Sequence, residues 1–121
     1  MRSFLKSVKQ AMKGILMFFR HERNAKIQGC IAIITIALSV WLHISGIEWV
    51  LVLLCIALVI GLEMLNTAIE KIGNQLTTDL HPDIKIIKDV SAGAVLWSSI
   101  CSAIIGGIIF IPKIIHHIFN T

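Results

Sequence analysis

The sequence predicts an all-α integral membrane protein with an N-terminal amphipathic surface helix followed by three transmembrane helices. Three observations predict this class. Of the 121 residues, 56% are hydrophobic and only 15% are charged. The mean hydropathy is +0.85. Three long, almost uncharged stretches follow a basic N-terminal segment. A soluble domain carries about a quarter charged residues, so the composition excludes an ordinary water-soluble or disordered chain. The length allows a single domain over residues 1–121.

The first expected element is a helix over residues 1–20 that lies on the membrane surface. Its apolar residues recur at helical spacing along one face, and its cations fall mostly on the other side. The apolar positions are Phe4, Leu5, Val8, Met12, Ile15, Leu16 and Phe19, and the basic positions are Lys6, Lys9, Lys13 and Arg20. Such a basic segment suits either anionic lipid or nucleic acid. Because an apolar stretch follows at once, the sequence favours the membrane, and no nucleic-acid partner is expected.

The three expected membrane helices cover residues 27–46, 47–70 and 83–111. Each is long enough to cross about 30 Å of hydrocarbon at 1.5 Å per residue. The third begins at Pro82 and Asp83, a pair typical of a helix start. Its first two turns are therefore expected to project from the bilayer.

The distribution of positive charge predicts the topology. The turn over residues 43–49 contains no Lys or Arg, whereas the N-terminal segment and the connection over residues 71–89 contain several. The positive-inside rule then places the N-terminus and that connection in the cytoplasm and the 43–49 turn outside. Trp41 and Trp49 flank this outer turn, as interfacial aromatic residues do.

Three polar residues share one face of the second span. Glu63, Asn66 and Glu70 stand at positions i, i+3 and i+7, within about 60° of one another on a helix. Glu63 lies near the cytoplasmic edge of the hydrocarbon, and Glu70 lies about 10 Å further along the axis, close to water. An acid inside a membrane span is costly and is a functional hypothesis by default.

The topology gathers further charged residues at the level of Glu70. Glu22 directly precedes the first span, and Lys88 and Asp89 directly precede the third. Two carboxylates at the water side suit Mg²⁺ shared with phosphates, and a lysine suits phosphate itself. A deeper carboxylate could accept a proton from a hydroxyl held at the interface. The arrangement is what phosphoryl transfer from a soluble nucleotide to a membrane alcohol needs.

Two other interpretations stay open at this point. Charges at the ends of spans are commonly solvated or paired, here Glu70 with Lys71, Lys88 with Asp89, and Glu22 with Arg23 or Lys26. Glu63 and Asn66 could form a structural hydrogen bond between helices or line an ion pathway. The alternative function is therefore a non-enzymatic three-span protein, such as a pore-forming or accessory subunit.

Three stretches resemble a known family, the small prokaryotic diacylglycerol kinases and undecaprenol kinases. They are residues 19–26 (FRHERNAK), residues 63–70 (EMLNTAIE), and the segment that runs from His81-Pro82 through Lys88-Asp89 to residues 92–96 (AGAVL). The resemblance implies a homotrimer in the bacterial cytoplasmic (inner) membrane, with active sites between subunits, that uses ATP and Mg²⁺ to phosphorylate a lipid alcohol. The RHExN stretch and the His-Pro pair look like the undecaprenol kinase branch, so undecaprenol is favoured over diacylglycerol.

The resemblance also implies roles for individual residues. Glu63 matches the catalytic base on the lipid hydroxyl, and Glu22 and Glu70 match the metal-binding glutamates. The expected nucleotide-binding residues are Gln10, Glu22, Glu70, Asp79, His81, Lys88 and Asp89, and the expected lipid-binding residues are Asn24, Gln28, Trp41, Trp49, Glu63 and Asn66. Two positions depart from the family pattern: Asn74 stands where an acid is frequent, and Gln10 stands where an aromatic residue is frequent.

Overall fold

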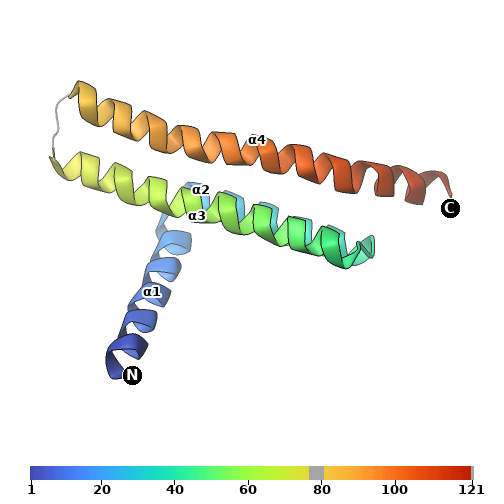
Figure 1. Ribbon diagram of the computed structural model, residues 1–121, viewed down its shortest axis with the longest axis horizontal. Coiled ribbons are helices and arrows are strands. Elements are labelled where there is room, and N and C mark those ends of the chain that lie inside the picture. Colours follow the sequence, from blue (N-terminus) through green and yellow to red (C-terminus); the bar gives the residue numbers. More distant parts are fainter. Residues whose placement is uncertain (77–80, 121) are drawn as a thin grey trace.

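In a computed structural model, the structure is described for residues 1–76 and 81–120, and these residues form four helices. They are α1 (Arg2–His21), α2 (Arg23–Trp41), α3 (Gly46–Leu76) and α4 (Pro82–Phe119), and the described residues contain no strand. Figure 1 shows α2, α3 and α4 running side by side, with α1 leaving this bundle at a steep angle from the start of α2.

Three of the helices, α2, α3 and α4, are long and apolar enough to cross a membrane, which confirms the predicted number of spans by length and composition. Most of their apolar side chains are exposed in the single chain, among them Ile33, Leu58 and Ile108. Exposed aliphatic surface on this scale is unfavourable in water and is covered in a bilayer by lipid or by other helices. The protein is therefore a membrane protein.

The turn between α2 and α3 takes up the end of the first predicted span. We expected a span over residues 27–46, whereas α2 ends at Trp41 and α3 begins at Gly46. Ser45 and Glu48 explain the early start of α3. The Glu48 carboxylate accepts from the Ser45 N–H (2.9 Å), and the Ser45 hydroxyl accepts from the Glu48 N–H (3.3 Å). This reciprocal pair is a capping box, which satisfies N–H groups that a helix start would otherwise leave unpaired.

The two long helices extend past the hydrocarbon thickness at their ends. At 1.5 Å per residue, the 31 residues of α3 and the 38 of α4 measure about 47 and 57 Å. Helix α4 continues through Pro112 to Phe119, where we expected the span to end at residue 111. Two contacts hold its final turns: Lys113 pairs with Glu48 at 3.1 Å, and the ring of His117 packs edge-on against Trp41 at 4.5 Å.

The interior changes character along the bundle. Near the α2–α3 turn it is apolar, with Ile44, Val52, Ile109 and Phe110 buried together. Toward the end where α1 joins, the buried positions of α3 become Glu63, Asn66 and Gly73. The helix that carries the apolar core at one end therefore carries buried polar groups at the other.

Candidate active site

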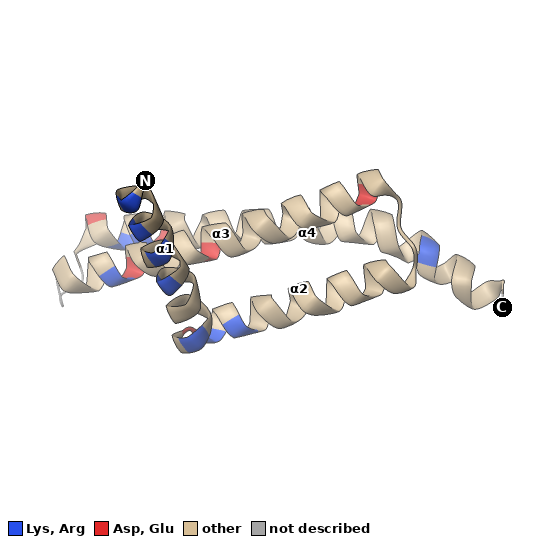
Figure 2. Cartoon of the chain, turned by 90° about the horizontal axis from the view of Figure 1, so that it is seen from below, with Lys and Arg blue, Asp and Glu red and all other residues tan. Residues whose placement is uncertain are grey.

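Most of the charged residues gather at one end of the bundle, around α1, the start of α2 and the neighbouring ends of α3 and α4 (Figure 2). Beyond Glu63, the three long helices carry no Lys, Arg, Asp or Glu until Glu48 and Lys113 near the opposite end. This charged end also holds the buried polar residues of α3. It contains most of the residues that the sequence singled out.

Glu63 is the deepest acid of the site. Only 4% of its surface is exposed, and its Oε1 accepts from the Nδ2 of Asn24 on α2 at 3.5 Å. That is a long bond, and Asn24 carries no charge to offset the carboxylate. A carboxylate buried beside a neutral amide is costly, and natural proteins keep such groups mainly where they act.

Asn66 lies one turn further along α3 on the same face. It is 7% exposed, and its Oδ1 is buried without a hydrogen-bond partner among the described residues. A buried acceptor that lacks a partner is unfavourable by about 1–3 kcal/mol. The oxygen is thus free to accept from a ligand hydroxyl or to approach a cation.

Glu22 lies at the joint between α1 and α2, in extended backbone conformation. Its carboxylate pairs with Lys71 of α3 at 3.4 Å, not with Arg23 or Lys26 as the sequence allowed. Glu22 and Lys71 also line a hollow of about 570 Å³ between α1 and α3. Because Lys71 follows Glu70 in the chain, the ion pair brings Glu22 to the level of Glu70.

Lys88 and Asp89 point to different neighbours. The Lys88 ammonium donates to the Oδ1 of Asn74 on α3. Asp89 pairs with Lys85, one turn back on α4, at 2.7 Å. Thus Lys88 reaches across to α3, whereas Asp89 lies on an exposed part of α4.

The other predicted nucleotide residues make few contacts. His81 caps α4 by accepting at its Nδ1 from the Asp83 N–H at 3.3 Å. Gln10 and Glu70 are exposed. Asp79 lies outside the described residues.

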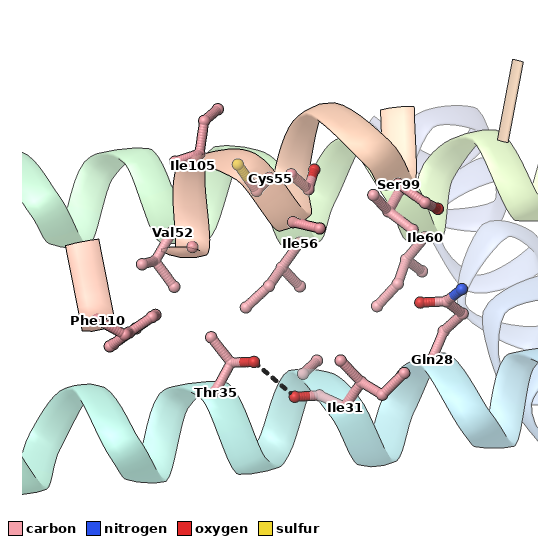
Figure 3. Close-up of a pocket in the computed structure, with 15 residues that line it drawn as sticks. Gln28, Ile31, Thr35, Val52, Cys55, Ile56, Ile60, Ser99, Ile105 and Phe110 are labelled. Carbon is pink, nitrogen blue, oxygen red and sulfur yellow. Dashed lines mark hydrogen bonds between the residues drawn. The ribbon is translucent and has the colours of Figure 1, made fainter. Parts of the chain in front are cut away.

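A groove of about 350 Å³ separates α2 from the α3–α4 pair (Figure 3). Its lining is mostly aliphatic, and Gln28, Thr35 and Ser99 add polar groups. In Figure 3, Gln28 and Ile31 of α2 face Ile56 and Ile60 of α3 across it. Gln28 follows Asn24 by one helical turn, and Ile60 precedes Glu63 by three residues, so the groove ends beside the Asn24–Glu63 pair.

Trp41 and Trp49 do not join this group. Trp49 packs against the apolar core near Phe110, and Trp41 contacts His117. Fourteen residues of α3 separate Trp49 from Glu63, which is about 21 Å along the helix axis. Of the predicted lipid-binding residues, Asn24, Gln28, Glu63 and Asn66 lie together, and the two tryptophans lie at the far end.

The donors present suit a magnesium ion shared with phosphates. Glu22, Glu70 and the open Oδ1 of Asn66 are hard oxygen ligands of the kind that Mg²⁺ prefers. Within residues 1–76 and 81–120, no group of three His, Cys, Asp or Glu residues is placed to hold a metal ion. Mg²⁺ commonly needs only one or two carboxylates when phosphate and water oxygens complete its shell. The residues therefore fit a nucleotide-bound ion better than a cage made by this chain alone.

Comparison with known proteins identifies the family. The family model described as prokaryotic diacylglycerol kinase matches residues 9–110. The chain belongs to this family. It is 39% identical over 111 residues to the undecaprenol kinase of Bacillus subtilis, covering 92% of this chain and 90% of that protein. The diacylglycerol kinase of Synechocystis sp. is 32% identical over 114 residues, which is 93% of this chain and 65% of that protein. The diacylglycerol kinase of Escherichia coli is 26% identical over 100 residues, with 83% and 82% covered.

This member of the prokaryotic diacylglycerol kinase family is therefore a lipid kinase, and the predicted family and enzyme class are confirmed. Sequence reasoning missed Lys71 as the partner of Glu22 and Gly73 as a neighbour of Lys88. No local spacing pairs Glu22 with Lys71, because the contact depends on how the α1–α2 joint packs on α3. Gly73 did carry a signal: it follows Asn66 by seven residues, on the same helix face.

Proposed function

We propose that this lipid kinase transfers the γ-phosphate of ATP, bound with Mg²⁺, to the hydroxyl of undecaprenol. The observation that carries the proposal is the buried Glu63 carboxylate, which lies beside Asn24 where the apolar groove ends. Undecaprenol is favoured because the 39% identical relative is named an undecaprenol kinase. Diacylglycerol is the second candidate, since the relatives at 32% and 26% identity are named diacylglycerol kinases.

In this proposal Glu63 is the catalytic base. The lipid hydroxyl must lose its proton as its oxygen attacks phosphorus, and a carboxylate within hydrogen-bond reach can accept that proton. Asn24 holds one carboxylate oxygen of Glu63, which leaves the other to face the hydroxyl. Asn66 supplies an acceptor one turn away, with which the hydroxyl or the phosphate-bound ion can be oriented.

The chain of the lipid is proposed to lie in the groove between α2 and the α3–α4 pair. A lipid alcohol needs an apolar path that ends near the reacting group, and Gln28 and Ile60, which line this groove, lie about one helical turn from Asn24 and Glu63. Gln28 lies at that end, near the expected headgroup. Trp49 would contact a long chain only far from its hydroxyl, because it lies about 21 Å from Glu63 along the axis of α3, and Trp41 lies at the same far end of the bundle as the last residue of α2.

The nucleotide is proposed to bind on the water side of the same helix face. Glu22 and Glu70 would hold the ion, and the bound Mg²⁺ would offset the negative charge of the phosphates. The Lys88 ammonium would bind the polyphosphate. His81, Asp89, Asp79 and Gln10 are the remaining candidates for nucleotide contacts. Phosphoryl transfer depends mainly on positioning and charge stabilisation, which a rigid helix face supplies well.

The proposed assembly is a homotrimer in the bacterial cytoplasmic membrane, with the N-terminus in the cytoplasm. The basic segment supports this orientation, because positive residues concentrate on the cytoplasmic side. Helix α1 is proposed to lie on the membrane surface: Phe4, Leu5 and Leu16 are more than half exposed, and lysines alternate with them along the helix.

The proposal is tested with purified protein, ATP, Mg²⁺ and either undecaprenol or diacylglycerol in mixed micelles. We expect lipid phosphate to form, with undecaprenol giving the higher kcat/KM. Glu63→Gln should reduce kcat by at least 100-fold and leave the oligomer intact on size exclusion. Glu48→Gln is the matched control, because it changes an acid of the same helix at the opposite end of the bundle. Wild-type turnover by Glu63→Gln, or equal loss in Glu48→Gln, would refute the role of Glu63.

A further inference from the structure

We propose that Gly73 and Asn74 are positioning residues that hold the Lys88 ammonium in place for the nucleotide phosphates. We call Gly73, Asn74 and Ile84 the Lys88 seat. The inference rests on the proposed nucleotide role of Lys88 and adds to it two residues of α3 that bind no substrate themselves.

Gly73 gives the Lys88 side chain its path across α3. Gly73 is buried, and a Cβ atom built on it would meet the Lys88 Cε at 2.9 Å and the Ile84 Cγ2 at 3.3 Å. At Gly61, in the same helix, a Cβ atom would meet nothing within 4 Å. A glycine in a helix interior is less favourable for helix stability than alanine, so a glycine at a crowded position needs a reason. Here the lysine stem occupies the space that a side chain would take.

Asn74 fixes the end of that path. Its Oδ1 accepts from the Lys88 Nζ at 2.5 Å, and this bond joins α3 to α4 across fourteen residues of sequence. Within residues 1–76 and 81–120, no carboxylate lies within ion-pair distance of Lys88, since Asp89 is paired with Lys85. The ammonium is thus held by the Asn74 amide oxygen, which fixes its position without a carboxylate from the described residues.

The Lys88 seat places the Lys88 ammonium next to the helix face that carries the proposed active-site residues of α3. Gly73 follows Asn66 by seven residues and Glu63 by ten, so all three lie toward one side of α3. Asn74 follows Glu70 by four residues, one turn along the helix. Along this face the groups therefore follow in this order: the proposed base Glu63, the unpaired amide oxygen of Asn66, the proposed metal ligand Glu70, and the Lys88 ammonium bound to Asn74.

Restricting the Lys88 side chain before the nucleotide binds lowers the entropic cost of nucleotide binding. A free lysine side chain loses rotamer entropy when it is fixed in one conformation. Packing over Gly73 and the bond to Asn74 restrict the side chain before the nucleotide arrives, so less of that cost falls on binding. A disrupted seat should weaken nucleotide binding and leave lipid binding unchanged.

The test compares Gly73→Ala, Asn74→Leu, Asn74→Asp and Lys88→Met in the full-length protein. The measured quantities are kcat, the KM for MgATP and the KM for the lipid. Gly61→Ala and Gln75→Leu are the matched controls on the same helix, and thermal unfolding checks each variant. We expect Gly73→Ala and Asn74→Leu each to raise the KM for MgATP by about 3- to 10-fold and to change the KM for the lipid by less than twofold.

Two further results distinguish positioning of Lys88 from a purely structural contact between α3 and α4. Asn74→Leu should add nothing in the Lys88→Met background if Asn74 acts through Lys88. Asn74→Asp retains an acceptor oxygen and should stay closer to the wild-type KM for MgATP than Asn74→Leu does. Additive effects in the double variant, or equal damage from Asn74→Asp and Asn74→Leu, would overturn the inference.

The failure of the proposed function would look different. If Lys88→Met leaves the KM for MgATP unchanged, the nucleotide role of Lys88 is wrong, and the seat loses its purpose. If Lys88→Met raises that KM but Gly73→Ala and Asn74→Leu do not, only the positioning inference is wrong.

Discussion

Replacing Asn66 with leucine should make the protein more stable and much less active. Asn66 is almost fully buried, and its Oδ1 lacks a hydrogen-bond partner in the described part of the chain. Leucine has a similar shape and no polar group to leave unpaired. Relief of a buried unsatisfied acceptor is worth about 1–3 kcal/mol. For a chain of this length that corresponds to a rise in Tm on the order of 4–10 °C.

The activity should change in the opposite direction. If the open Oδ1 of Asn66 orients the lipid hydroxyl or the phosphate-bound ion, its loss should reduce kcat by about 10²- to 10³-fold. A gain in stability together with a loss of activity is the signature of a strained functional group. The assay is thermal unfolding of the purified kinase in detergent, with initial rates measured on the same preparation.

Ser98→Ala is the matched control for Asn66→Leu. The Ser98 hydroxyl is also buried, but it donates to the Val95 carbonyl at 3.0 Å, so its removal relieves no unpaired group. We expect little or no rise in its Tm. A lower Tm for Asn66→Leu would mean that Oδ1 has a structural partner in the assembled protein, and full activity would mean that it has no role in the reaction. Either result would refute the reasoning.

Three other changes test separate parts of the molecule. Ser45→Ala removes half of the capping box of α3 and should lower stability by about 1 kcal/mol, seen as a lower Tm, whereas Ser7→Ala on exposed α1 should not. Glu22→Gln should raise the Mg²⁺ concentration needed for half-maximal rate several-fold, and an unchanged Mg²⁺ requirement would contradict the metal role of Glu22. Lys71→Met removes only the exposed partner of Glu22 and should shift the free energy of unfolding by less than about 1 kcal/mol. Ala32→Phe narrows the groove and should raise the KM for undecaprenol about 10-fold at constant KM for MgATP, and equal changes in both constants would argue against a lipid chain in the groove.

The helical architecture was predictable because hydrophobicity and length alone decide which segments can cross a bilayer. The relation between Glu63, Asn66 and Glu70 was equally predictable, since the pitch of a helix places them on one face without any tertiary information. The structure adds that Glu63 and Asn66 are the buried members and that Glu70 is exposed. Burial depends on which neighbours cover the helix, and a single sequence does not encode that in local spacing.

The turn between α2 and α3 shows a different limit. Leu42 and Ile44 are apolar, so a hydropathy argument extends the first span through them to residue 46. In the structure Ile44 is buried in the core and Leu42 packs against it, and both belong to the turn. Apolarity reports burial and not helicity, so it cannot distinguish a buried turn from a span. The Ser45 and Glu48 pair was a better signal of the helix boundary than hydropathy, because a capping box marks the residue at which a helix begins.

The partners of the charged residues were the least predictable feature, and the reason lies in the architecture. Glu22–Lys71 and Lys88–Asn74 both join α3 to a segment distant in sequence, and both contacts depend on how helices approach one another near the bundle end. Helix α3 is the common member of these contacts. Because it is about 47 Å long, one rigid rod extends from the apolar core through the depth of Glu63 to the level of Lys88. A reaction that joins a lipid alcohol to a water-soluble nucleotide needs its groups held at two depths, and a single uninterrupted helix fixes their spacing and their rotation at once.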